Sequence, residues 1–248
     1  MEILFALAIA PAIIGLAYIY IRDKYEKEPW RLLLAGCAAG ALLTPLIIAI
    51  STWLMRFMPV VGRVGEAVFI AFAVSAFVEE GLKFAALCLL IWYNRNFNEP
   101  MDGIVYAVFI SLGFAGVENV LYVFNPQLGG LDTAIARALL SVPSHGFFGV
   151  SMGYYFALAK FESAIETPIK HFQILGASIP LFKRGINKRH RYIGMAFIAP
   201  YLIHAIYNAM LLSGNWLILA GFVPFVVIFW RNGLMKIKKH LEMSPFRA

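Results

Sequence analysis

Seven apolar segments, each long enough to cross a lipid bilayer, constrain what this 248-residue chain can fold into. A spanning helix needs about 20 predominantly apolar residues. Hydrophobic residues make up 61% of the chain and charged residues 14%, whereas a soluble domain has roughly 45–50% and 25%. We therefore expect an all-α, polytopic membrane helical bundle that forms a single integral membrane domain over residues 1–248. The predicted membrane helices lie near residues 3–21, 32–54, 67–93, 103–124, 134–159, 193–212 and 216–233.

Lysine and arginine residues are divided unevenly between the two ends of these segments. The loops at the end that carries the N-terminus contain only Arg56 and Arg63, whereas the loops at the other end, including the long loop 161–192, and the C-terminal tail contain nearly all the others. Because cytoplasmic loops are rich in basic residues, we predict an outside N-terminus, a cytoplasmic C-terminus and an odd number of spans in the cell membrane. These loops also explain the net charge of +7, and no nucleic-acid recognition motif accompanies it.

The third apolar segment contains two adjacent glutamates, Glu79 and Glu80, followed by Lys83. A charge near the centre of a membrane helix costs roughly 2.5–3.5 kcal/mol on insertion scales, so such residues are functional candidates. Lys83 lies about one helical turn from both carboxylates and can neutralise one of them. An ion pair that only joins helices needs a single glutamate, so the second one favours a catalytic role. Two coupled carboxyl groups can supply a general base and a supporting acid.

The fourth apolar segment also carries polar residues where a membrane helix has few. Glu118 and Asn119 follow Gly113 and Gly116, a glycine pair that permits close helix packing. Asp102 stands near the start of the segment, where its charge would favour the helix dipole. We count Glu118 among the candidate catalytic residues and Asn119 and Asp102 as supporting residues.

The fifth and sixth segments each contribute a histidine. His145 follows Pro143 deep in its segment, and Arg137 at the outer end of the same segment is expected to extend towards the membrane surface. His204 and Asn208 lie one turn apart on one helix face and can donate hydrogen bonds to a developing oxyanion. The depths of the polar residues differ by about 10 Å at 1.5 Å per residue, which helix tilt can absorb. We therefore expect one buried polar cavity built by four helices.

These motifs resemble those of the PrsW family of intramembrane proteases, which is itself similar to CAAX prenyl proteases, bacteriocin-processing enzymes and a gamma-secretase subunit. The resemblance covers residues 67–212, which we take as the catalytic core. Prenyl-type relatives have a histidine where this chain has Glu118, so His145 is our candidate for that histidine's role. The resemblance rests on Glu79-Glu80-x-x-Lys83, on Asp102-Gly103-Ile104-Val105-Tyr106 with Gly113-Phe114 and Glu118-Asn119, on His145-x-x-x-Gly149 and on His204-x-x-x-Asn208.

The resemblance implies a membrane-embedded peptidase that hydrolyses a peptide bond in or near the membrane span of another membrane protein. It implies that Glu79 and Glu80 activate water, that His204 is an essential partner and that Asn208 accompanies it at the oxyanion. The implied substrate is a single-pass protein, such as an anti-sigma factor cut at site 1. Within this scheme we favour Glu80 as the base.

The remaining polar residues have secondary roles in this mechanism. Lys83 would balance the charge of the glutamates, and His145 and Glu118 would position water or protonate the leaving amine. We expect no metal or other cofactor, because the candidate ligands lie on separate helices and no His-Glu-x-x-His motif is present.

Three alternatives stay open from the sequence. Glu118, His145 and His204 form a ligand set of the kind used by zinc hydrolases, so a zinc-dependent membrane protease is one of them. Intramembrane charges also build proton or ion pathways, which a transporter coupled to protons or ions would need. A non-catalytic membrane scaffold is the third.

Overall fold

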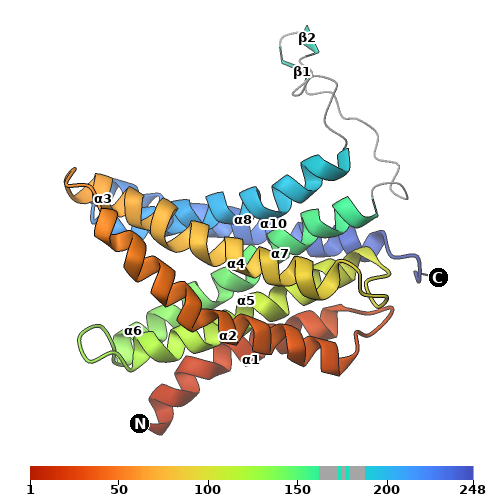
Figure 1. The fold of residues 1–248 in the computed structure, drawn as a ribbon, viewed down its shortest axis with the longest axis horizontal. Coiled ribbons are helices and arrows are strands. Elements are labelled where there is room, and N and C mark those ends of the chain that lie inside the picture. The colour runs from red at the N-terminus through yellow and green to blue at the C-terminus, as the bar shows by residue number, and fades with distance from the viewer. Residues whose placement is uncertain (162–172, 175–176, 179–187, 248) are drawn as a thin grey trace.

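Helices make up nearly all of the described chain in the computed structural model (Figure 1). The structure describes residues 1–161, 173–174, 177–178 and 188–247. The predicted all-α fold is confirmed for these residues, apart from one short antiparallel pairing within the long loop. The elements are α1 (Glu2–Arg22), α2 (Trp30–Leu54), η1 (Met55–Phe57), α3 (Arg63–Phe69), η2 (Ile70–Ala76), α4 (Phe77–Ile91), α5 (Pro100–Val123), α6 (Leu131–Ala136), η3 (Arg137–Ser141), α7 (Val142–Lys160), β1 (Gln173–Ile174), β2 (Ala177–Ser178), α8 (Lys188–Leu212), α9 (Trp216–Ala220) and α10 (Phe222–Glu242).

Five helical stretches in the described part of the chain are long and apolar enough to cross a membrane. The other two predicted segments are helical as well, but a π-helix divides each of them: η2 separates α3 from α4, and η3 separates α6 from α7. The N-terminus and the C-terminus lie at opposite ends of the bundle (Figure 1). The five stretches are Glu2–Arg22, Trp30–Phe57, Pro100–Val123, Lys188–Leu212 and Trp216–Glu242.

Helix α5 is the core of the bundle, and most of its side chains are buried. Its neighbours approach it closely through small residues. A Cβ atom at Gly113 would lie 2.1 Å from the carbonyl oxygen of Cys37 on α2, and one at Gly153 on α7 would lie 2.1 Å from that of Gly103 on α5. Neither position can therefore carry a side chain, which confirms that the glycines permit close helix packing.

The two π-helices have local causes, and both precede candidate site residues. Pro143 has no N–H group, and its ring clashes with the carbonyl four residues earlier in a regular α-helix, so the helix widens at η3. In η2, the carbonyl of Val74 accepts a hydrogen bond from Ser51 Oγ at 3.0 Å. Because a π turn changes the helical register of the residues that follow it, η2 and η3 set the directions of the side chains on α4 and α7.

Candidate active site

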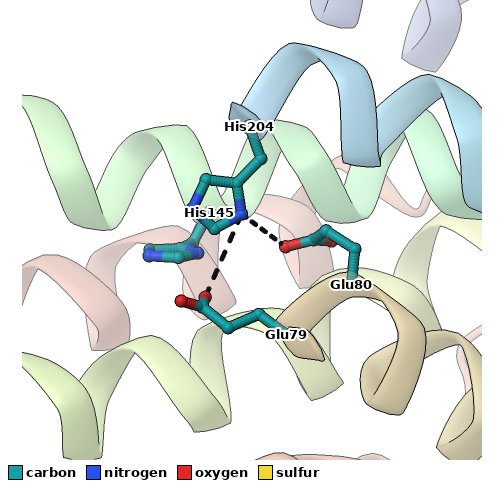
Figure 2. A group of neighbouring side chains, drawn as sticks. All are labelled: Glu79, Glu80, His145 and His204. Atoms are coloured by element: carbon teal, nitrogen blue, oxygen red, sulfur yellow. Dashed lines mark hydrogen bonds and ion pairs between the residues drawn. The ribbon is translucent and has the colours of Figure 1, made fainter. Parts of the chain in front are cut away.

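Four buried side chains from three helices converge at one place in the bundle (Figure 2). Glu79 and Glu80 extend from α4, His145 from α7 and His204 from α8. One nitrogen or oxygen atom from each residue lies within 4.8 Å of those of the other three. The structure thus brings together four residues that are far apart in the sequence, as expected for a common polar site.

Lys83 places its ammonium group between these side chains. Its Nζ atom donates to Glu80 Oε1 at 2.8 Å and to Glu79 Oε2 at 3.3 Å, and it lies 3.3 Å from His145 Nδ1. Lys83 is completely buried. The positive charge of the ammonium therefore compensates the negative charge of two adjacent buried carboxylates. A metal cation bound at the position of the ammonium would contact the same atoms.

The hydrogen-bond partners of the two histidines define their tautomers. Lys83 donates to His145 Nδ1, so the proton of His145 is on Nε2, which lies 3.2 Å from Glu118 Oε2. Asn208 Nδ2 donates to His204 Nε2 at 3.0 Å, so His204 donates from Nδ1 to Glu80 Oε1, also at 3.0 Å. Each ring therefore directs one N–H group at a carboxylate.

Ser75 belongs to the same network, although the sequence analysis did not include it. Its hydroxyl donates to Glu79 Oε1 at 2.9 Å and accepts from Asn208 Nδ2 at 2.8 Å. Ser75 thus joins the amide on α8 to the first glutamate on α4. The available signal was its place one turn before Glu79, which puts both residues on one helix face.

Arg137 corrects one prediction. Instead of extending to the membrane surface, it donates from Nη2 to Glu118 Oε2 at 2.7 Å and from Nε to Asn119 Oδ1 at 2.8 Å. The amide of Asn119 also donates to the carbonyl of Ala8 on α1. Glu118 and Asn119 are therefore linked to the site through an ion pair with Arg137 and through His145, because a carboxylate inside the bundle is stabilised by a nearby cation.

Asp102 lies away from this site. It is the third residue of α5, and its Oδ2 atom accepts hydrogen bonds from the backbone N–H groups of Asn98 and Glu99 in a capping box. Sixteen residues of helix separate it from Glu118, which is about 24 Å at 1.5 Å per residue. Its supporting role in the site is therefore corrected to a structural role at the start of α5.

A cavity of about 300 Å³ leads from this site towards one end of the bundle. Glu79 and Glu118 line it, whereas Glu80 is not among its lining residues. The hydroxyl of Thr44, also in the lining, is buried without a hydrogen-bond partner in the described chain. The cavity lies between α2, η2 with the start of α4, and α5, and it is lined by Thr44, Ile47, Ile48, Ser51, Ile70, Val74, Ser75, Glu79, Phe114, Glu118, Leu121, Tyr122 and Asn125.

Comparison with known proteins identifies a family for a chain with this site. The family model described as PrsW family intramembrane metalloprotease matches residues 28–231. A relative named Protease PrsW from Clostridioides difficile (strain 630) is 34% identical, over 97% of this chain and 92% of the relative. Proteins of the same name from Geobacillus kaustophilus (strain HTA426) and Bacillus subtilis (strain 168) are 33% and 32% identical, over 95% and 97% of this chain and 91% and 96% of the relatives. No solved structure matches the chain.

Proposed function

Because the chain belongs to the PrsW family of intramembrane proteases, we propose that Glu79, Glu80, His145 and His204 form its peptide-hydrolysing centre. The chain is a multi-pass membrane peptidase, so the transporter and the scaffold no longer compete as explanations. The observation that carries the proposal is the convergence of four buried acid–base groups beside a cavity that Glu79 lines.

We assign the general base to Glu79 rather than to Glu80. Glu79 lines the cavity, whereas Glu80 is fully buried and is held by Lys83 and His204. Glu79 takes a proton from a water molecule in the cavity while the water oxygen bonds to the scissile carbonyl carbon. The C–N bond then breaks, and the proton passes from Glu79 to the leaving amine. Ser75 orients the carboxylate through its 2.9 Å hydrogen bond.

His204 and Asn208 remain our candidates for stabilising the oxyanion. In the described arrangement the N–H group of His204 is bonded to Glu80, and the amide of Asn208 donates to Ser75 and to the His204 ring. A bound substrate must therefore displace one of these hydrogen bonds before the oxyanion can accept one. The ammonium group of Lys83 adds positive charge next to the same place.

The family description names a metalloprotease, and the residues of this site fit a metal ion. Two carboxylates and two imidazoles offer buried donor atoms, and Oε2 of Glu80 is buried without a partner in the described chain. His145 directs its other nitrogen at Glu118, and metal-binding histidines are usually oriented by a carboxylate in this way.

Glu80, His145 and His204 would hold the ion where Lys83 now places its ammonium group, and Glu79 would remain unbound as the general base. Glu118 would then orient His145 rather than bind the metal, unlike in the zinc set considered from the sequence. When bound at these residues, a divalent ion would supply Lewis-acid chemistry. Elemental analysis of the purified protein tests this part: we expect one metal per chain, and much less in a His145→Ala variant. Equal metal content in both proteins would contradict it.

We further propose seven spans, with 63–91 and 131–160 as the two that contain π-helices, and an outside N-terminus. The cavity then opens towards the outer surface, because its lining includes Ser51 near the end of α2 and Asn125 just after α5. Both helices end on the side of the bundle that carries the N-terminus (Figure 1). Five residues of helix separate Glu118 from Val123, the last residue of α5, and correspond to about 8 Å of depth. A site at this depth suits the outer cut in a single-pass protein, as in site-1 cleavage of an anti-sigma factor.

The test compares new protein N-termini in membranes from cells that express the natural chain or a Glu79→Gln variant at matched levels. Glu242→Gln serves as the control, because this side chain is 51% exposed at the end of α10. We expect single-pass proteins to be cleaved, near the outer end of their spans, only by the natural chain and the control. Identical N-termini in all three membranes would contradict the proposal.

A further inference from the structure

A second cavity, of about 580 Å³, lies between α7, α8 and α10 and shares no lining residue with the cavity beside the active site. Most of its lining is aromatic or aliphatic, but one end is polar. Ser151, Tyr154 and Tyr155 of α7 face Lys236 and Lys239 of α10 at that end. The site described above does not use any of these residues.

The two lysines bring positive charge that nothing in the described chain neutralises. Lys236 donates to Ser151 Oγ at 2.7 Å, and its Nζ lies 5.0 Å from the centre of the Tyr155 ring. Lys239 lies over Tyr154, with its Nζ 5.7 Å from the ring centre. Among the described residues, neither ammonium has a carboxylate within 4 Å, whereas Lys238 on the same helix pairs with Glu242 at 3.9 Å.

The rest of the cavity is apolar and extends deeper along α10. Phe225, Ile228 and Phe229 line it, and Phe225 lies fourteen residues before Lys239, about 21 Å along a helix. Ile203 of α8 closes the side of this apolar part. The cavity therefore has a cationic end near the last turns of α7 and α10 and a long apolar end within the bundle.

We propose that this cavity binds one anionic phospholipid of the cytoplasmic leaflet, with its phosphate at Lys236 and Lys239 and an acyl chain along Phe225 and Phe229. Basic pockets between membrane helices on the cytoplasmic side suit such headgroups. The inference needs the bundle to cross the membrane with its C-terminus inside, but it does not depend on the catalytic proposal. The full chain in detergent can be tested without any proteolytic assay.

The experiment measures lipid retention by native mass spectrometry, with phosphatidylglycerol and phosphatidylcholine as probes. We expect the natural chain to retain one phosphatidylglycerol and no phosphatidylcholine. A Lys236→Gln/Lys239→Gln variant should bind about 30-fold more weakly, because two basic groups near anionic lipid contribute about 2 kcal/mol together. The matched control is Lys238→Gln, which removes an exposed lysine of the same helix and should retain the lipid.

Four results would overturn the proposal. Equal retention by the natural chain and the double variant would show that the lysines do not recognise the phosphate. Equal binding of the two lipids would show that headgroup charge does not matter. Displacement of the lipid by glycerol phosphate at similar concentration would show an anion site without an acyl-chain requirement. Unchanged lipid binding in an Ile228→Trp variant, which fills the apolar end, would show the same.

Discussion

Buried carboxyl groups gather at two places along α5, and the two groups differ in what surrounds them. Near the C-terminal end of the helix, Glu118 lies with Glu79 and Glu80 in what we call the catalytic cluster. At the other end, four acids form what we call the end cluster: Asp23, Glu28, Glu99 and Asp102. Apart from Glu118, whose side chain is 17% exposed, both clusters are almost inaccessible to solvent.

The difference lies in the cations. Lys83 and Arg137 make ion pairs in the catalytic cluster, whereas no ion pair involves the end cluster among the described residues. Burial and neighbouring carboxyl groups raise the pKa of Asp23 to about 7 and that of Glu28 to about 10. Burial beside a cation favours the charged form of an acid, which can act on water, whereas burial without an ion pair favours the protonated form.

The largest expected effect is a difference in cleavage activity between variants of the catalytic cluster and variants of the end cluster. We expect Glu79→Gln to lower the cleavage rate by about 10²–10⁴, the range for losing a general base. Asp102→Asn should keep most of the activity, because this side chain lies at the far end of α5. The measurement is turnover of one identified substrate in proteoliposomes, at equal amounts of folded protein. Comparable losses of turnover in both variants would contradict the expected functional difference between the two clusters.

Removing the central cation should affect the catalytic cluster next most strongly. Lys83→Met leaves two adjacent buried glutamates without their ammonium partner, and breaking a buried pair costs about 3–5 kcal/mol. We expect a large fall in thermal stability, measured by unfolding in detergent. A Glu79→Gln/Lys83→Met variant should recover part of it, because one charge is then absent. Unchanged stability in Lys83→Met would show that the cluster does not need this cation.

The end cluster should make stability depend on pH. The pKa of Asp23 rises from 3.8 unfolded to about 7 folded, because burial, Asp102 and Glu99 outweigh Lys27. The folded state therefore binds more protons, so stability is greatest at low pH and falls as pH rises through 7. We expect a loss on the order of 1 kcal/mol, after solvent screening, that accumulates between about pH 4 and pH 7 and levels off above it. Asp23→Asn should flatten this dependence, and an equally steep curve in that variant would contradict the assignment.

The smallest effect concerns the orientation of Glu79. Ser75→Ala removes one hydrogen bond, worth about 1 kcal/mol, so we expect about a fivefold fall in turnover. Ser75→Thr keeps a hydroxyl and should retain more activity. Ser51→Ala is a useful comparison, because its hydroxyl contacts a backbone carbonyl of η2 instead of Glu79. Equal turnover in Ser75→Ala and the natural chain would remove Ser75 from the mechanism.

The sequence predicted the helical membrane fold and the family, because long apolar segments and their intramembrane polar residues are local signals. It also predicted that Glu79, His145 and His204 would meet, because polar groups in a membrane helix need partners. It could not predict the pairing of Arg137 with Glu118, because Arg137 begins η3 and the apolar pattern does not reveal a π-helix. Asp102 was wrongly given a supporting role in the site because it belongs to the same motif, on the same helix, as Glu118. Membership of one motif does not show that two residues lie at the same end of the helix.

The ammonium group of Lys83 also bears on how the protein is assembled. It is on the same helix as Glu79 and Glu80, one turn away, so α4 can enter the bilayer with part of its charge already neutralised. His145 and His204 belong to helices that are synthesised later, 62 and 124 residues further along the chain than Lys83 and Glu80 respectively. Unpaired charges resist membrane insertion, so Lys83 would allow this helix to insert into the lipid before the helices that carry the histidines. The proposed catalytic centre is complete only once α8 has joined the bundle.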